Sequence, residues 1–313
     1  MKTPTYLNDK SQVIILRQNQ VTNKSSFEVD NLTIRFTGKE SVYIYIEDFE
    51  NKDITFDFLE NSNIKLYIIL RSSKNVDYSF LMNVEKSARI DVFTGLRNKG
   101  SVEVNVKRVI NISKEATLIL DNALINMGHT TINDFVNLNE EYANVEINQL
   151  NIGSYNDISN VTQEIFHNAK HTKSNIENSL ISNSNAKLKY SVSGRIFKGN
   201  EFSSCSQTNK GIILKENGEI EVEPKLYIDE YNVEASHGAA IGQIDDEQLY
   251  YLLSRGLTEL QARSLIISGY TLPFINSIQD EDIQQLVERQ IHKKITEVDA
   301  VWWTIHISRI FHN

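Results

Sequence analysis

The chain has 313 residues, of which 40% are hydrophobic, and its formal net charge is −9. A chain of this length and hydrophobicity can bury a substantial core. The acidic balance argues against nucleic acid and against an anionic membrane surface as partners, because both require clustered Lys and Arg. The single cysteine, Cys205, excludes an internal disulfide framework and a metal site built only from cysteines of this chain.

The N-terminus, residues 1–9, has no apolar segment of the kind that a signal peptide requires. Elsewhere in the sequence, no apolar run approaches the roughly 20 residues of a membrane-spanning helix. These two observations lead us to expect a cytoplasmic protein that does not act in a membrane.

A hydrophobic period of two dominates the sequence from residue 31 to residue 243. Such alternation predicts β-strands with one buried face. It is clearest in the segments 32–36, 42–46, 54–58 and 64–68.

A repeated pattern, a small residue followed by alternating polar and apolar positions, begins at residues 88, 101, 116, 143 and 186. The intervals between these starts are close to multiples of about 14 residues, as in a repeat protein. Short strands at a steady interval predict a mainly β fold of the β-solenoid type, in which each coil pairs with the next. A β-sandwich, with turns roughly every 8–12 residues, is the alternative.

The hydrophobic period changes to that of a helix near residue 244. Asp245 is a candidate N-cap, and leucines follow at helical spacing until Gly256, which would end the helix. Thr258 and Gln261 form a capping box for a second helix, which Gly269 would end.

A third amphipathic segment spans residues 283–295, and a further one could continue through Trp302 and Trp303. The two tryptophans fit partner binding and packing within the helical part equally well. The sequence thus predicts three parts: a short N-terminal segment 1–30, a β-helix core 31–243 and a C-terminal helical domain 244–313.

The most informative motifs lie between residues 226 and 269. Ser-His-Gly-Ala at 236–239 is followed by Gly-Gln-Ile-Asp-Asp-Glu-Gln-Leu-Tyr-Tyr at 242–251 and by Ser-Arg-Gly at 254–256. This ordered series resembles the end of the core domain of the SufB/SufD family. Its Ser-His-Gly-Ala element has the form found in the SufD branch. Many members of that branch carry a cysteine where this chain has Ala235.

The resemblance implies a right-handed parallel β-helix followed by a C-terminal α-helical domain. It also implies a scaffold subunit of the SUF iron–sulfur cluster assembly complex that is not itself an enzyme. Such a subunit pairs with a SufB-like subunit, or with a second copy of itself when isolated, and docks a SufC-like ATPase through its helices. A transient iron–sulfur cluster would form at the subunit interface and pass to apo-proteins, with no cluster stably bound to the isolated chain.

The resemblance singles out His237 as a candidate iron or cluster ligand at the subunit interface. A neutral imidazole can bind iron through one ring nitrogen, and histidine replaces cysteine at some clusters. Cys205 is a further metal candidate, and an ordinary free thiol is the alternative for it. The candidate ATPase-binding residues are Asp246, Gln248, Tyr251, Arg255 and Gly256.

Other sequence features favour simpler interpretations. His167 and His171 have helical i, i+4 spacing but lie in a β pattern, so we expect surface histidines rather than a zinc site. The sequence has no Gly-rich phosphate loop, no Gly-x-Ser-x-Gly and no Cys-x-x-Cys, which supports a non-enzymatic role. A β-solenoid interaction module and a polysaccharide-acting β-helix protein are the alternative functions.

Overall fold

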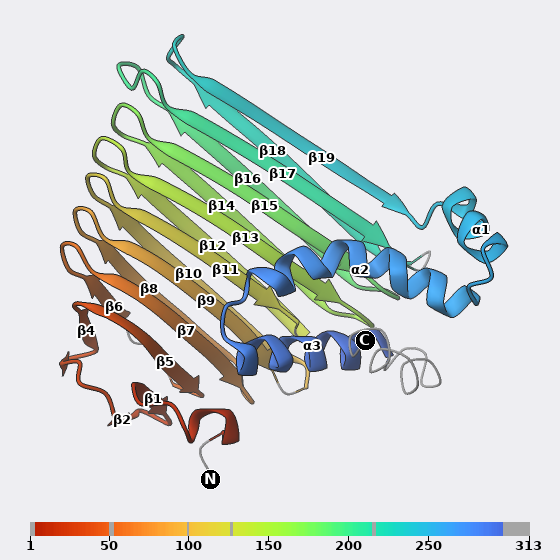
Figure 1. Cartoon of the computed structure of the whole chain (residues 1–313), viewed down its shortest axis with the longest axis horizontal. Helices are drawn as coiled ribbons and strands as arrows, with labels where there is room; N and C mark the ends of the chain where they lie inside the picture. Colours follow the sequence, from red (N-terminus) through yellow and green to blue (C-terminus); the bar gives the residue numbers. More distant parts are fainter. Residues whose placement is uncertain (1–3, 50–52, 99, 126–127, 215–216, 297–313) are drawn as a thin grey trace.

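The computed structural model describes residues 4–49, 53–98, 100–125, 128–214 and 217–296. Its strands form two sheets, and from β4 onward the chain alternates between them from one strand to the next. Among the described strands, every pairing between coils is parallel, and antiparallel pairing occurs only between β1 and β2 and between β3 and β4. The fold is therefore the predicted β-solenoid followed by helices (Figure 1). Trp302 and Trp303 lie outside the described residues.

Sheet A consists of β1 (Val13–Arg17), β2 (Gln20–Asn23), β5 (Lys39–Glu47), β7 (Asn63–Ser72), β9 (Arg89–Asn98), β11 (Thr117–Leu124), β13 (Asn144–Gly153), β15 (Lys173–Ser182), β17 (Ser204–Ile213) and β19 (Glu234–Gln243). Sheet B consists of β3 (Val29–Asp30), β4 (Thr33–Phe36), β6 (Asp53–Phe58), β8 (Val76–Val84), β10 (Val102–Ile112), β12 (Gly128–Leu138), β14 (Ile158–His167), β16 (Lys187–Ile196) and β18 (Glu219–Ile228). A short 3-10 helix, η1 (Thr5–Leu7), precedes β1.

One type of turn recurs where the chain passes from sheet B to sheet A. A residue with positive φ is followed by a small, buried one, as in Glu115-Ala116 and Tyr142-Ala143. The residue with positive φ turns the backbone, and the small side chain fits where the chain re-enters the solenoid. The turn explains the small residue at three of the five predicted repeat starts, residues 88, 116 and 143. One coil contains two of the repeat intervals of about 14 residues that the sequence shows. Asn83 and Asn111, which are hydrogen bonded to each other on successive coils, are accordingly 28 residues apart.

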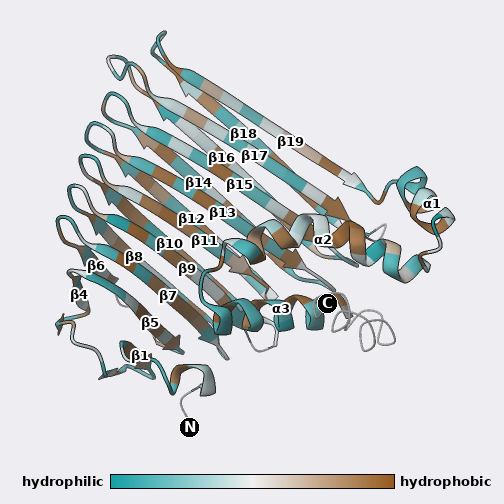
Figure 2. Ribbon diagram, viewed as in Figure 1, coloured by the Kyte–Doolittle hydropathy of each residue, from teal (hydrophilic) through white to brown (hydrophobic). Residues whose placement is uncertain are grey.

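The interior of the solenoid is apolar over most of its length, and hydrophobic and polar bands alternate along the strands (Figure 2). An exception is a row of polar side chains on sheet A that occupy neighbouring positions on successive strands: Thr94, Asn122, Gln149, Asn178 and Asn209. Arg108 on sheet B faces this row. Its guanidinium donates to both carboxylate oxygens of Asp134, at 2.7 and 2.8 Å, and to Asn122.

The two ends of the solenoid differ. At the N-terminal end, β2 and β3 fold back as antiparallel strands on the first coil. At the other end, β18 and β19 are the last strands of their sheets, and no described strand pairs with their outer edges. All residues of β19 are exposed. The solenoid is therefore capped at one end and open at the other.

Three helices follow the last coil: α1 (Asp246–Ser254), α2 (Glu259–Ser277) and α3 (Glu281–Thr296). The predicted N-cap at Asp245 and the Thr258–Gln261 capping box are confirmed. The predicted end of the second helix at Gly269 is wrong, because α2 continues through Pro273 to Ser277. None of the described helices has the length and apolar character that crossing a bilayer demands.

Packing on the solenoid explains the length of α2. Helices α2 and α3 lie over the outer face of sheet A (Figure 1). The buried cluster between the helices and the sheet includes residues on both sides of Gly269. They are Ile266 and Ile267 before it and Phe274 and Ile275 after it. This burial outweighs the hydrogen bond to the Gly269 carbonyl that Pro273 cannot make. The apolar residues of the predicted third amphipathic segment are buried as well: Ile283, Leu286, Val287, Ile291 and Ile295.

The buried Arg108–Asp134 pair should be sensitive to loss of one partner. We expect Arg108→Leu to lower the free energy of unfolding by about 3–5 kcal/mol, because Asp134 would remain charged without a partner. The double variant Arg108→Leu/Asp134→Leu should recover most of this loss. Urea unfolding followed by circular dichroism measures both. Equal destabilisation by the single and double variants would contradict the account.

Candidate functional site

His237 lies in the middle of β19, on the open end of the solenoid. In the parallel ladder it is the neighbour of Gln207 in β17. Cys205, Gln207 and Asn209 are buried at alternate positions of β17 and so face the interior. Their neighbours in register, Ala235, His237 and Ala239, share that face. His237 is exposed because no described strand covers the coil that carries it.

Hydrogen bonds from the preceding coil hold the backbone beside His237. Asn209 is buried, and its Nδ2 donates to the Gly238 carbonyl at 3.1 Å. Asn178 in turn donates to Asn209 Oδ1 at 2.8 Å and to Gln163 Oε1 at 2.9 Å. The polar row inside the solenoid thus ends at the carbonyl of Gly238, the residue after His237.

Cys205 lies one strand inward from Ala235 and is 1% exposed. Burial raises the pKa of its thiol, although hydrogen bonds with Ser174 and Gln207 act in the opposite direction. Gly194 on sheet B faces this thiol, and a Cβ at Gly194 would lie 2.3 Å from the sulfur. The protonated, enclosed thiol is therefore poorly suited to react from the surface at rest.

The expectation of two surface histidines is wrong for His167. Its ring is fully buried, with Nδ1 2.8 Å from Thr172 Oγ1 and Nε2 2.9 Å from Ser174 Oγ. Burial lowers the pKa of His167 to about 4. The alternation of the strand continues through Ile165 to His167 and could have indicated this inward position. His171 is half-buried in a turn, and its ring stacks on Phe202.

The residues expected to bind an ATPase lie on α1 and just after it. Asp246, Gln248, Tyr251, Arg255 and Gly256 are all exposed. The Arg255 guanidinium lies over the Tyr251 ring, 5.1 Å from its centroid. Helix α1 has no buried residue and projects away from the solenoid (Figure 1). The structure therefore gathers these five residues on α1 and the turn after it, outside the solenoid.

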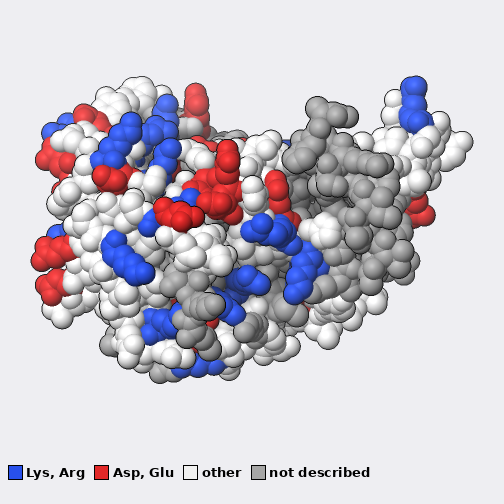
Figure 3. Space-filling model, turned by 60° about the horizontal axis from the view of Figure 1, so that its bottom comes forward, with Lys and Arg blue, Asp and Glu red and all other residues white. Residues whose placement is uncertain are grey.

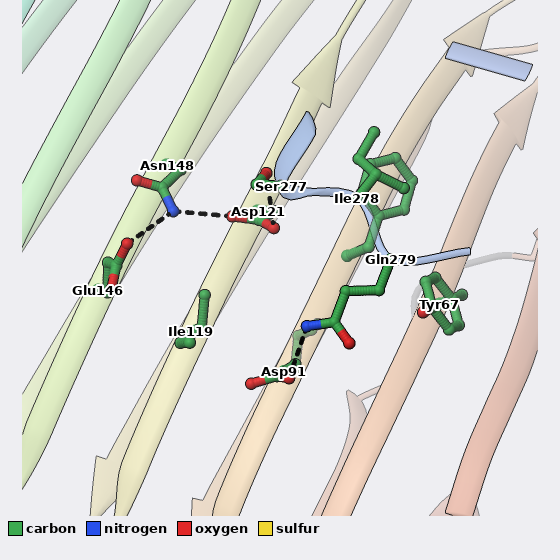
Figure 4. Close-up of a pocket in the computed structure, with 11 residues that line it drawn as sticks. Tyr67, Asp91, Ile119, Asp121, Glu146, Asn148, Ser277, Ile278 and Gln279 are labelled. Atoms are coloured by element: carbon green, nitrogen blue, oxygen red, sulfur yellow. Dashed lines mark hydrogen bonds between the residues drawn. The ribbon is translucent and has the colours of Figure 1, made fainter. Parts of the chain in front are cut away.

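A separate cleft of about 220 Å³ lies where the α2–α3 connection meets sheet A (Figure 4). Asp121 is 9% exposed and accepts hydrogen bonds from Asn148 at 2.9 Å and from Ser277 at 3.2 Å. Gln279 donates to Asp91 at 3.4 Å, and Glu146 accepts from Asn148. These contacts join the helical pair to the sheet. Sequence patterns could not indicate this cleft, because its residues are far apart along the chain.

Charged groups elsewhere do not mark a further site. Among the described residues, no group of three or more His, Cys, Asp and Glu side chains is arranged to hold a metal ion. On the face shown in Figure 3, basic and acidic side chains are interspersed. The only potential ligand on the open end that the sequence singled out is therefore His237, with Cys205 enclosed beneath it.

The core that carries His237 is a parallel β-solenoid whose last coil is uncovered among the described residues. Residues 47–270 match the model of the family described as SUF system FeS cluster assembly, SufBD core domain. The chain belongs to this family.

Relatives in the family include proteins named iron–sulfur cluster assembly protein SufD. The protein from Bacillus subtilis is 28% identical over 172 residues, which cover 55% of this chain and 39% of that protein. The protein from Escherichia coli is 24% identical over 184 residues, 59% of this chain and 44% of that protein. A SufBD family protein from Archaeoglobus fulgidus is 42% identical over 82 residues, 26% of this chain and 22% of that protein. The matched region spans less than half the length of each relative.

Asp121 should make the contact between helices and sheet dependent on pH. Burial raises its pKa, so the folded state is penalised when Asp121 is charged. The penalty is absent below the pKa of the unfolded chain and grows as pH rises through the folded pKa. We therefore expect Asp121→Asn to raise the melting temperature at pH 7 to 8 and to lose this advantage as pH falls.

The matched control is Asp77→Asn. Asp77 also accepts from an asparagine, Asn105, but it is exposed, so its replacement should leave the melting temperature nearly unchanged. Melting curves between pH 4 and pH 8 test both variants. A destabilised Asp121→Asn protein at pH 8 would contradict the assignment of a burial penalty.

Proposed function

We propose that the chain is a non-catalytic scaffold subunit of a SUF iron–sulfur cluster assembly complex. In this proposal it pairs with a SufB-like subunit, or with a second copy when isolated, through the open end of the solenoid. Its α1 region docks a SufC-like ATPase. A nascent cluster, which is cargo rather than a resident cofactor, forms at the paired ends and is passed to apo-proteins. The observation that carries the proposal is an exposed histidine on the uncovered last coil of a SufBD core.

The backbone of β19 supports pairing through this end. The Glu234 amide donates to the carbonyl of Ser203, the residue before β17, so amides at alternate positions from Glu234 face β17. The amides between them, including those of Ala235 and Ala239, face the free edge. An uncovered edge of this kind is a template for another strand. In β18, Pro224 falls at an outward position, where its missing N–H costs no ladder bond.

Side chains around the open end support the same role. Phe202, Tyr227, Tyr231 and Ile241 are large hydrophobic residues that are exposed in or beside the last coil. A single exposed hydrophobic residue is ordinary, but a group beside an unpaired sheet edge is typical of a protein interface. We infer that the partner covers both the edge of β19 and these side chains.

His237 would contribute one donor to the cluster. A neutral imidazole lends the lone pair of one ring nitrogen to iron, and its second nitrogen remains a hydrogen-bond donor. Replacing a thiolate with an imidazole reduces the negative charge of the ligand set. In the proposal the partner completes that set, and a shared set suits a cluster that must be released.

Helix α1 supports ATPase docking because few of its own side chains are covered, although Leu252 packs against the buried cluster. It has nine residues and none is buried, whereas isolated helices shorter than about 12–15 residues are marginal in water. Its exposed Tyr250, Tyr251 and Leu253 would be covered by a partner. The family assignment and this exposed helix favour the assembly role over a polysaccharide-acting protein.

The first test of the proposal is His237→Ala in the complex reconstituted anaerobically with SufB-like and SufC-like subunits. We expect the cluster absorbance to be lost, while the melting temperature and ATPase binding stay unchanged because His237 is exposed. Tyr251→Ala/Arg255→Ala is the opposite control and should weaken ATPase binding. A normal cluster yield from the His237→Ala complex would rule out the proposed ligand.

A second test addresses pairing through the β19 edge. Ala239→Pro removes one outward-facing N–H and should leave the bonds between β17 and β19 in place, as Pro224 does in β18. We expect at least a tenfold loss of affinity for the SufB-like subunit, measured by titration calorimetry. Ala239→Ser keeps the N–H and is the matched control. Wild-type affinity of the proline variant would argue against strand pairing at this edge.

A further inference from the structure

Gln207 lies directly inward of His237. The two residues are neighbours in the ladder between β17 and β19 and share the interior face. Neighbouring strands are about 4.8 Å apart, so the two side chains stand next to each other. No hydrogen bond between them is present in the described structure. Any ligand held by His237 would have Gln207 as the polar side chain beneath it.

The amide of Gln207 is held in one orientation. Its Nε2 donates to the Lys225 carbonyl of β18 at 3.2 Å. The absent side chain at Gly194 leaves room for this arrangement, because a Cβ there would lie 3.3 Å from Gln207 Nε2. With the nitrogen engaged in this way, a flip of the amide would cost the bond to sheet B.

The oxygen of the same amide has no partner. Gln207 is 1% exposed, and its Oε1 is buried without a hydrogen-bond donor among the described residues. A buried acceptor left in this state costs about 1–3 kcal/mol. The cost is unexplained by folding alone, because most buried polar groups in native proteins are satisfied. The position of the oxygen, one strand inward of His237, indicates which donor is missing.

Histidine ligands need such an acceptor. A metal-bound imidazole almost always donates its other N–H to a carbonyl or carboxylate, which fixes the tautomer and the orientation of the ring. His237 makes no hydrogen bond through its ring in the described structure, whereas the Asn209 bond to Gly238 already holds the adjacent peptide. The backbone is thus fixed, and the ring is the part of the residue that still needs orientation.

We propose that Gln207 is a positioning residue whose Oε1 accepts the second ring N–H of His237 when the imidazole binds iron. This inference deepens the proposed function and rests on His237 being a ligand. The hydrogen bond selects the tautomer that leaves the other nitrogen free for the metal, and it satisfies the orphan acceptor at the same time. Gln207 itself touches neither the iron nor the cluster.

The experiment uses the full chain and Zn²⁺ as a diamagnetic probe of the imidazole. Nitrogen-15 spectra of the histidine side chains at pH 8 report both the tautomer of His237 and its binding of Zn²⁺. Gln207→Met keeps the length of the side chain and removes the acceptor, whereas Gln207→Glu keeps an acceptor. We expect the methionine variant to lose the single bound tautomer and to bind Zn²⁺ 10- to 100-fold more weakly. The glutamate variant should bind at least as tightly as the wild type.

Two controls separate the possible failures. Asn98→Leu alters another buried amide that also has unpartnered atoms, but it lies on β9, far from β19 in the order of sheet A, so it should leave His237 unchanged. Zn²⁺ binding that survives in His237→Ala would overturn the ligand assignment itself and this inference with it. If His237→Ala loses the binding but Gln207→Met retains wild-type affinity and tautomer, the inference about Gln207 alone is wrong. Thermal melts establish that each variant is folded, and the glutamate variant keeps the test decisive should the methionine variant be unstable.

Discussion

Backbone pairing between successive coils is the constraint on which this molecule depends. Each strand from β5 to β17 is bonded on both sides by strands of neighbouring coils. This pairing places equivalent turns, each with a positive-φ residue before a small buried one, next to one another on successive coils. The last coil has no further coil beside it, so the backbone N–H and C=O groups at its outer edge lack a strand partner. At the N-terminal end, β2 and β3 meet this need within the chain. At the other end the need remains, and that end carries His237.

The interior becomes more polar toward the open end. In the first coils the inward row of sheet A is aliphatic, with Ile44 and Ile68, whereas its later members are Asn178 and Asn209. Amides are a poor choice for core stability, because each one must be fully hydrogen bonded. They hold the backbone of a coil that no further coil covers. The buried amides near His237 therefore lower the stability of the core there, and in return they fix the backbone of the last coil.

Sequence alone predicted the solenoid and much of the helical part, because period-two alternation, capping boxes and the small-residue repeat are local signals. It failed at Gly269, where tertiary burial of Phe274 and Ile275 overrides a local stop signal. It placed His167 on the surface, although the strand alternation points it inward. It could not find Gln207, because the feature that distinguishes this residue is its register with His237, which is 30 positions away in the chain and set only by the coil length.

Hydrogen–deuterium exchange on β19 tests the central claim most directly. The account predicts that addition of the SufB-like subunit protects the outward-facing amides of Ala235, Ala239 and Ile241, which exchange freely in the chain alone. The amides that already bond to β17, such as that of Glu234, should change less. Protection that appears on another surface while β19 continues to exchange freely would contradict the account.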